Sequence, residues 1–348
     1  MEQFAQLPMQ PSLAQCPYCI TETPVKVHSH KERRYRCCTC RRTFSERYGT
    51  PLMHLKYPLP LVMLILALLS HGCPLAAIVF AFEIDERTVA SWQLKVGNHA
   101  RRVQYRFVCR RIIQLAQVQT DEVWVKLQRQ VAWVATALCV FPRLFIWGAV
   151  SLQRDKHLVL QVMSKVRQAS GRVIQPVLFC VDGFAAYPRI LKQLFATRDH
   201  SKRGRPKRIP WPKLNIVQVI KRYQGKRLSH IERRLVHGDW GTTSRLLVQT
   251  QTQVGCLNTA YIERFNATLR ARLPSLARRT RNLARTVKRL EVELFWSGVV
   301  YNFCTVHTTL QGTPAMAAGI TDELWSVRRL LLMRTPDIWD AELDHVFL

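Results

Sequence analysis

The chain has 348 residues, of which 48% are hydrophobic, a proportion typical of folded globular proteins with room for two or three domains. Lysines and arginines number 52 against 23 aspartates and glutamates, so the formal net charge is +29. Such an excess favours a polyanionic partner, nucleic acid above all, because released counterions drive that binding. A membrane surface is disfavoured, since the sequence has neither a basic amphipathic helix nor a lipidation signal.

The sequence carries no sign of export or of a membrane span. Its first residues, MEQFAQLPMQPSLAQ, lack both the positive and the apolar regions of a signal peptide. The most apolar run, residues 59–69, is too short to cross a bilayer, and His71, Gly72 and Pro74 follow it. Eleven cysteines is an odd number, which argues against a disulfide framework. We therefore expect a soluble protein in a reducing compartment, with no membrane partner.

Four cysteines form two Cys-x-x-Cys pairs, CPYC and CCTC, that stand about 17 residues apart. Two such pairs let tight turns present four thiolates in the tetrahedral arrangement that structural zinc prefers. The sequence therefore predicts a zinc ribbon over residues 14–50, after a tail of residues 1–13, with Zn²⁺ bound by Cys16, Cys19, Cys37 and Cys40. The alternative is a set of buried cysteines without a metal, and Cys38 is expected to take no part in either case.

Residues 51–104 show a helical pattern that predicts three helices. The first spans residues 59–69 and the second residues 75–82, and Asp85 is a good N-cap for a third over residues 86–99. Two short helices, a tight turn and an exposed third helix suggest a helix-turn-helix domain, although any three-helix bundle would give a similar pattern. On the third helix we expect DNA contacts from Arg87, Ser91, Gln93 and Lys95.

From residue 105 onward, alternating β-branched runs replace the helical pattern. They predict an antiparallel meander of three strands, followed by a helix, a short apolar strand buried on both faces, and another helix. The expected bounds are 118–127, 131–140 and 143–152 for the first three strands, then 156–170, 177–181 and 184–195. With a long helix expected over residues 282–306, this order predicts a mixed α/β domain at residues 105–320 and a C-terminal tail at 321–348.

A basic, proline-rich stretch interrupts this domain at residues 198–214. Its prolines and its run of like charges predict a loop rather than a core element. A solvated loop without a partner is one possibility, and contact with DNA phosphates is the one that the net charge favours. In that case we expect the contacts to come from Arg203, Arg205, Lys207 and Arg208.

Three acidic residues stand where this sheet would place an active site. Asp121 lies inside the first strand on the face covered by helices, and Asp182 ends the short apolar strand, a usual place for catalytic groups in α/β sheets. Glu263 lies in the first turns of a helix whose other charged residues are arginines. Each could instead be an ordinary strand, turn or surface acid. The rival ligands are Glu122, Asp239, Glu291 and Glu293.

Carboxylates next to a DNA phosphate would repel it unless divalent cations intervened. Mg²⁺, or Mn²⁺ in its place, prefers carboxylate and water oxygens, and two such ions roughly 4 Å apart promote in-line displacement at phosphorus. The sequence therefore predicts a catalytic site in which two metal ions are held by Asp121, Asp182 and Glu263. Around it we expect DNA contacts from Arg264, Asn266, Arg270, Arg278 and Arg279.

Several stretches between residue 16 and about residue 320 resemble bacterial insertion-sequence transposases of the Asp-Asp-Glu class, most closely the insertion-sequence-one-like group. The matching stretches are CPYC and CCTC, TDEVW, FCVDGFAAY, YIERFNATLRARLPSLARRT, and YNFCTVHTTL with TPAMAAGI. The resemblance implies a zinc ribbon and a helix-turn-helix domain before an RNase H-like catalytic domain. In that domain, Asp121, Asp182 and Glu263 would be the catalytic triad.

The resemblance further implies an enzyme that binds terminal inverted repeats in double-stranded DNA, cleaves the strands in a metal-dependent reaction and transfers the 3′ ends to target DNA. Such transposases are expected to act as homo-oligomers, because two ends must be held together, in the bacterial cytoplasm beside the nucleoid. Two alternatives stay open. One is a DNA-binding regulator derived from a transposase without catalysis, and the other is a nuclease without strand transfer.

Overall fold

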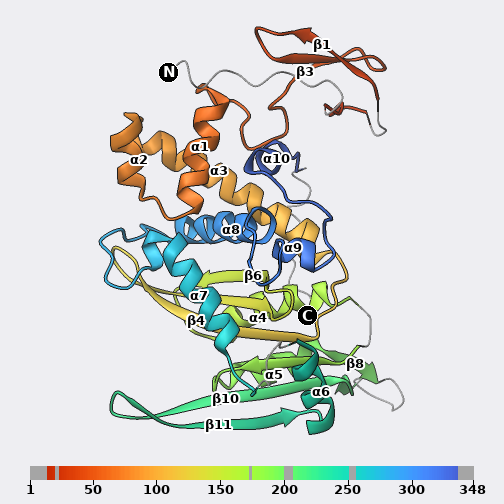
Figure 1. The fold of residues 1–348 in the computed structure, drawn as a ribbon, viewed down its shortest axis with the longest axis vertical. Coiled ribbons are helices and arrows are strands. Elements are labelled where there is room, and N and C mark those ends of the chain that lie inside the picture. Colours follow the sequence, from red (N-terminus) through yellow and green to blue (C-terminus); the bar gives the residue numbers. More distant parts are fainter. Residues whose placement is uncertain (1–13, 20–22, 172–174, 200–206, 251–255, 336–348) are drawn as a thin grey trace.

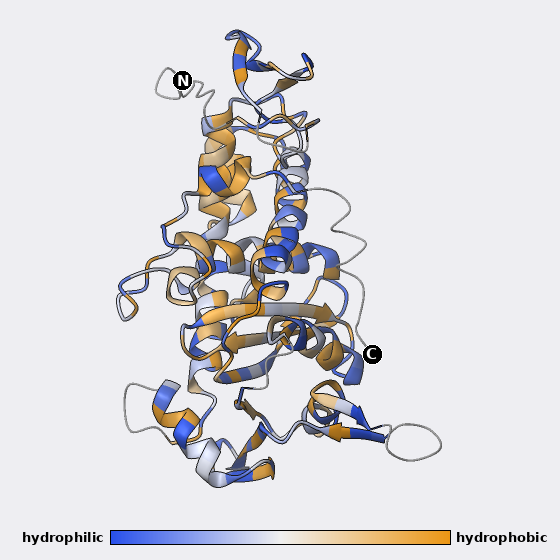
Figure 2. Ribbon diagram, turned by 90° about the vertical axis from the view of Figure 1, so that its right-hand side faces the viewer, coloured by the Kyte–Doolittle hydropathy of each residue, from blue (hydrophilic) through white to orange (hydrophobic). Residues whose placement is uncertain are grey.

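The computed structural model describes residues 14–19, 23–171, 175–199, 207–250 and 256–335, and it arranges them in layers along the long axis of the molecule (Figure 1). A small β-module lies at one end and a group of helices follows it, with a six-stranded sheet and a separate two-stranded sheet beyond. Hydrophobic residues gather where the helices meet the larger sheet (Figure 2).

The first module is a three-stranded antiparallel sheet made of β1 (Val25–Ser29), β2 (Arg34–Cys37) and β3 (Thr43–Ser45). Its small core centres on Tyr35 and Phe44, which pack with the buried cysteines of the two Cys-x-x-Cys pairs. Hydrophobic burial on this scale is too small to stabilise a fold alone, so such modules depend on a cross-link or a metal.

Three helices follow at positions close to those predicted: α1 (Leu59–Ser70), α2 (Leu75–Phe82) and α3 (Glu86–Gln104). Asp85 caps α3 as expected, since its Oδ1 accepts hydrogen bonds from the backbone N–H groups of Arg87 at 2.9 Å and Thr88 at 3.2 Å. Only residues 83–85 separate α2 from α3. This short turn is the connection that a helix-turn-helix arrangement requires.

Helix α3 extends five residues beyond the predicted end, because its C-terminal half packs against α8 (Val287–Cys304). Gly97 is the contact point: a Cβ there would lie 2.2 Å from Cβ of Val292, so only glycine lets the two helices approach this closely. A π-helical turn, Tyr105–Cys109, then leads into the sheet. The third helix is therefore exposed along only part of its surface.

The large sheet is mixed and has the strand order β11-β10-β7-β4-β5-β6. Its strands are β4 (Gln117–Lys126), β5 (Val131–Cys139), β6 (Leu144–Ser151), β7 (Val177–Val181), β10 (Leu214–Gln224) and β11 (Arg227–His237). The antiparallel meander β4-β5-β6 is confirmed, and β7 runs parallel to both β4 and β10. The mixed α/β class is thus confirmed, with the predicted bounds correct to within one residue for β4 to β7.

Helices cover both faces of this sheet, as two neighbouring residues of β4 show. Asp121 contacts Asn266 of α7 (Ala260–Arg272), whereas Glu122 contacts Tyr187 of α5 (Ala186–Leu194). Because successive strand residues point to opposite faces, α7 and α5 must lie on opposite sides. Helix α4 (Lys156–Ala169) packs beside α5, and α8 packs beside α7.

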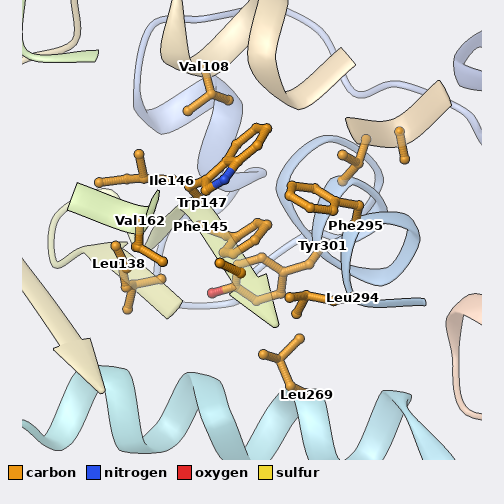
Figure 3. Close-up of a cluster of buried hydrophobic side chains, with 14 of the residues drawn as sticks. Val108, Leu138, Phe145, Ile146, Trp147, Val162, Leu269, Leu294, Phe295 and Tyr301 are labelled. Carbon is orange, nitrogen blue, oxygen red and sulfur yellow. The ribbon is translucent and has the colours of Figure 1, made fainter. Parts of the chain in front are cut away.

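Aromatic side chains from β6 and α8, together with Leu269 of α7, form the central core between the sheet and the helices (Figure 3). Phe145 stacks on Phe265 at a centroid distance of 5.4 Å, and Trp147 meets Phe295 edge-on at 4.6 Å. Helix α8 starts at Val287 rather than at the predicted residue 282, because Thr286 caps it by accepting a hydrogen bond from the Arg289 N–H.

The basic stretch at residues 198–214 is not a simple loop, so that prediction is wrong in part. Its ends belong to an antiparallel pair, β8 (Ala196–Asp199) and β9 (Lys207–Pro210). Lys207 and Arg208 are exposed on β9, whereas Arg203 and Arg205 lie outside the described residues. The hairpin β10-β11 and helix α6 (Trp240–Thr250) follow, and the sequence analysis predicts neither of them.

The chain finally returns to the helical layer. After the short helices η4 (Pro274–Leu276) and α9 (Pro314–Ala317), α10 (Val327–Leu332) lies within the segment expected to be a tail. It packs near α1, and the carbonyl oxygen of Leu330 lies 2.8 Å from Nε2 of His99 on α3. Among the helices of the described residues, none combines the length and apolarity needed to cross a membrane.

Candidate metal and nucleic-acid site

Parallel pairing of β4 with β7 brings two of the predicted acids together. Asp121 lies within β4, and Asp182 directly follows β7, whose residues pair with the preceding part of β4. Carboxylate oxygens of Asp121, Glu122 and Asp182 all lie within 4.8 Å of one another. Oxygen donors this close could hold a divalent cation. Glu122, a rival ligand in the sequence, thus belongs to the cluster.

Asp121 is held in place by a buried amide. Asn266 of α7 donates from Nδ2 to Oδ2 of Asp121 at 2.9 Å, and Thr136 of β5 donates to Oδ1 of Asn266 at 3.1 Å. Asn266 is 1% exposed and its amide orients an acid, so the structure gives no support to the DNA contact expected of it. Burial, together with the negative charges of Glu122 and Asp182, raises the pKa of Asp121 to about 6.

Arg154 bridges the other two acids of the cluster. Its Nη2 lies 2.8 Å from Oε2 of Glu122 and 2.7 Å from Oδ2 of Asp182. The guanidinium also stacks between two aromatic rings, 4.6 Å from the ring centroid of Phe184 and 5.3 Å from that of Trp133. This fixed cation partly neutralises the cluster, and it orients Asp182 together with the backbone N–H of Phe184.

The side chain of Glu122 is fully buried on the α5 face of the sheet. It accepts a short hydrogen bond from the Tyr187 hydroxyl as well as the contact from Arg154. Burial raises the pKa of Glu122 above its ordinary value, although the hydrogen bond from Tyr187 opposes the change. A carboxylate so enclosed is placed to hold Arg154 rather than to reach a substrate.

Glu263, the third predicted acid, faces the same space but is not part of the close cluster. Its Oε1 accepts from Nζ of Lys221 on β10 at 2.5 Å and from Oγ1 of Thr259 at 2.7 Å. Burial alone would raise the pKa of Glu263, but the hydrogen bonds from Lys221 and Thr259 outweigh it and lower the pKa. The structure thus unites two of the three predicted acids and holds the third nearby.

A cavity of about 870 Å³ connects these groups. Asp121, Asp182 and Glu263 line it together with four cationic side chains, those of Arg154, Lys221, Arg270 and Arg278. Two of the residues expected to contact DNA, Arg270 and Arg278, thus line the cavity. Arg264 and Arg279 are exposed but do not line the cavity. Arg154 and Lys221 are paired with the acids of the cavity, whereas Arg270 and Arg278 form no ion pair within the described residues.

Three of the four residues that the sequence analysis expects to contact DNA from α3 are exposed. Arg87, Ser91 and Lys95 are exposed at spacings of four residues, so they form one stripe along the helix. Gln93 is 5% exposed and accepts a short hydrogen bond from Arg289 of α8. The expected contact of Gln93 with DNA is therefore wrong, because α8 covers that side of α3.

The four cysteines of the N-terminal module meet as predicted. Their Sγ atoms all lie within 4.8 Å of one another, with Cys16 and Cys40 3.6 Å apart and Cys19 and Cys37 3.8 Å apart. Tetrahedral zinc with bonds of about 2.3 Å places sulfur atoms about 3.8 Å apart. The cluster therefore fits the size of a zinc site, while Cys38 is exposed and takes no part.

Three of the rival acids lie away from the cavity and have other partners. Asp239 caps α6 by accepting from the backbone N–H of Thr242 at 2.7 Å, and Glu293 pairs with Arg289 at 2.8 Å. Glu291 lies near Arg101 and Lys288, also away from the cavity. Sequence reasoning missed Arg154 and Lys221, whose carboxylate partners lie 28 to 42 residues away in the chain, a separation that leaves no local signal.

The site thus combines hard oxygen donors, a cavity beside them and cationic side chains on its walls. Such a site could bind divalent cations and position an anionic ester next to them. In comparisons with known proteins, no family model matches the chain, and the curated proteins give no significant match.

Proposed function

We propose that this protein is a DNA transposase of the Asp-Asp-Glu class. It would bind the terminal inverted repeats of a transposon, cleave the DNA strands and transfer their 3′ ends to target DNA. The observation that carries the proposal is the meeting of Asp121 and Asp182 at the β4–β7 junction, in a cavity that Glu263 also lines.

The order of elements supports an RNase H-like catalytic domain. An antiparallel meander leads through a helix to a parallel central strand. Asp121 lies on β4 and Asp182 directly follows β7, and these two strands pair in parallel at the centre of the sheet. In α/β sheets, catalytic groups gather at the carboxyl ends of such strands. The cysteine module and the three-helix unit, which precede the sheet in the chain, would bind the transposon ends.

The donor set fits divalent cations. Asp121, Asp182 and Glu263 offer only carboxylate oxygens, which Mg²⁺ and Mn²⁺ prefer. Carboxylate oxygens of Asp121 and Asp182 already lie within 4.8 Å of each other, close enough to bind the same ion. When bound, two such ions would activate the attacking oxygen and stabilise the leaving oxygen of the phosphodiester. The four cysteines would hold a structural Zn²⁺ in the N-terminal module.

The remaining residues of the site would position these groups and the DNA. Asn266 fixes the rotamer of Asp121, and Arg154 fixes that of Asp182. Arg270 and Arg278, on the wall of the cavity, would hold phosphates that flank the scissile bond. Because two transposon ends must be brought together, we propose that the active form is a homo-oligomer on double-stranded DNA.

One observation favours a second candidate, a transposase-derived DNA-binding regulator without catalysis. Glu263 is paired with Lys221 and lies outside the close cluster of acids. A protein that had lost catalysis would keep the cysteine module and the exposed stripe of α3 but would not need three acids at one metal site. Metal-dependent cleavage decides between the two candidates.

The test uses the full chain, DNA that carries the terminal inverted repeats, and Mg²⁺ or Mn²⁺. Wild-type protein should nick the ends, and Asp182→Asn should lower the cleavage rate more than about 100-fold. Losing a metal ligand lowers activity more than losing a residue that only hydrogen-bonds to a ligand, which typically costs about 10- to 100-fold. DNA binding by the variant should be retained, since the substitution is isosteric. A variant that cleaves at the wild-type rate would refute the assignment, and a wild type that binds without cleaving would favour the regulator.

A further inference from the structure

Helix α7 presents a second polar flank, separate from the one that lines the cavity. Glu263 and Arg270 lie on the cavity side. Residues spaced by three or four positions share another side of the helix, and none of them lines the cavity. These residues are Tyr261, Arg264, Thr268 and Arg272.

Two other segments bring basic groups to this second flank. Arg143, in the turn between β5 and β6, places its guanidinium 4.8 Å from the ring centroid of Tyr261. His307 follows α8 and meets the ring of Tyr301 edge-on at 4.7 Å. Arg272 lies 5.8 Å from the same Tyr301 ring and donates to Thr305. Segments far apart in the chain thus converge around Tyr301.

Three arginines lie close enough to Tyr301 and His307 for their positive charges to shift the pKa values of both side chains. Burial raises the pKa of Tyr301 to about 12, and the charges of Arg143, Arg272 and Arg264 oppose that rise. Burial likewise lowers the pKa of His307, and the same three arginines lower it further. Within the described part of the chain, no carboxylate forms an ion pair with any of the three. Gathered like charges of this kind favour an anionic ligand.

Two polar atoms in this cluster also lack a partner. Nη1 of Arg272 and Nε2 of His307 are buried and have no hydrogen-bond partner among the described residues. Buried polar atoms of this kind are costly unless a hydrogen-bond partner reaches them, and Nη1 of Arg272 can only donate. A phosphate group offers several acceptor oxygens, and the planar fork of arginine suits it well.

We propose that Arg143, Arg264, Arg272 and His307 form a phosphate-binding site for the DNA backbone, separate from the acidic cavity. The inference rests on the proposed function, because it takes DNA as the partner. A backbone phosphate fits better than a free one, since Arg264 is exposed and the cluster shares α7 with the cavity. The site also gives a physical role to the YNFCTVHTTL segment, which contributes Tyr301 and His307 but none of the three acids.

The test measures DNA binding by the full chain in buffer without Mg²⁺ or Mn²⁺, so that binding does not depend on metal at the acids. No chelator is added, because a chelator would remove zinc from the cysteine module. Arg264→Gln and Arg143→Asn each remove one charge, and asparagine tolerates the positive φ of 64° at position 143. Each variant should reduce the slope of log K against log salt by about 1, and the double variant by about 2. The loss should be the same for every DNA sequence, because phosphate contacts carry no sequence information.

Arg129→Gln is the matched control, since it removes the same charge from the turn at the opposite end of β5. This control should keep the wild-type salt slope. Equal slopes for wild type and both test variants would overturn the inference while leaving the proposed function intact. A wild type that fails to bind DNA at all would refute the proposed function as well.

A second arm separates the two sources of phosphate. Inorganic phosphate at millimolar concentration should raise the melting temperature of the wild type weakly and equally in Arg264→Gln, because the site needs a polyanion for strong binding. If inorganic phosphate alone stabilises the wild type strongly and the variants not at all, and the variants bind DNA with the wild-type salt slope, the DNA assignment is overturned.

Discussion

Nζ of Lys221 lies 2.5 Å from Oε1 of Glu263, and this ion pair holds the third predicted acid outside the cluster formed by Asp121, Glu122 and Asp182. The two residues come from β10 and from the first turn of α7, and both line the same cavity. A cation that recruits Glu263 must therefore compete with Lys221. The ion pair is a barrier to assembling the complete three-acid site.

Removing Lys221 should make metal binding tighter. Both partners are partly exposed, 33% and 45%, so the pair contributes only a modest amount of free energy. We expect Lys221→Met to lower the dissociation constant for Mn²⁺ by about two- to fivefold, measured by calorimetry. Arg222→Gln is the control, because Arg222 pairs with Glu232 rather than with a cavity acid. Weaker Mn²⁺ binding by Lys221→Met would show that Lys221 supports the site instead of competing with it.

Asn266 should act through Asp121 and not through DNA. Replacing it with alanine removes the hydrogen bond to Oδ2 of Asp121 and leaves Thr136 without its acceptor. We expect Asn266→Ala to weaken Mn²⁺ binding by about 10- to 100-fold, the usual effect of losing the outer support of a metal ligand. Binding of DNA in buffer without Mg²⁺ or Mn²⁺ should stay at the wild-type level. The opposite pattern, with DNA binding lost and metal affinity kept, would restore the contact predicted from the sequence.

Zinc content should depend on four particular cysteines out of the five in the N-terminal module. Purified protein should contain one zinc per chain by elemental analysis, and Cys37→Ser should lose it, because the small core of Tyr35 and Phe44 cannot replace the metal. Cys38→Ser is the matched control, since Cys38 neighbours Cys37 but is exposed. Equal zinc content in the two variants would contradict the predicted ligand set.

His99 should make stability depend on pH. It lies between α3 and the C-terminal segment, with Nδ1 3.1 Å from Oγ1 of Thr335, and burial lowers its pKa from 6.5 to about 4. The unfolded chain binds this proton at higher pH than the folded chain does. The neutral His99 ring therefore contributes fully to the free energy of unfolding above pH 6.5, and this contribution is lost as the pH falls toward 4. The loss lowers the free energy of unfolding by roughly 3 kcal/mol at most.

Urea unfolding at several pH values between 7.5 and 4.5 checks this expectation. The His99→Gln variant cannot take up the proton, so its free energy of unfolding should fall less steeply with decreasing pH than that of the wild type. Acids elsewhere titrate alike in both proteins and cancel in the difference. Parallel pH profiles for the two proteins would refute the assignment to His99.

The elements that were predicted well are those whose pattern is set locally. The strand Val177–Val181 is wholly apolar and buried on both faces, and α2 begins directly after Pro74, so their bounds are those predicted. The hairpin β10-β11 was missed because its outer half is exposed on both faces and shows no apolar alternation. Its turn is marked only by Gly225, at a positive φ of 61°.

In the candidate site, too, the features set by local sequence could be predicted and those set by tertiary packing could not. Asp121 and Asp182 could be found because strand parity and strand ends fix their positions before any tertiary contact is known. Burial of Gln93 could not be predicted, because it depends on α8, which is almost two hundred residues further along the chain. Exposure of a helical side chain is decided by which helix packs against it, and no local pattern contains that information.

The most direct measurement is a Mn²⁺ titration of the full chain, followed by the loss of the free-ion paramagnetic resonance signal. Wild type should bind Mn²⁺ saturably, and Asp182→Asn should weaken this binding by more than about tenfold. Asp239→Asn, at the cap of α6 and away from the cavity, should bind as the wild type does. Equal Mn²⁺ binding by the wild type and Asp182→Asn would contradict a metal site at the β4–β7 junction.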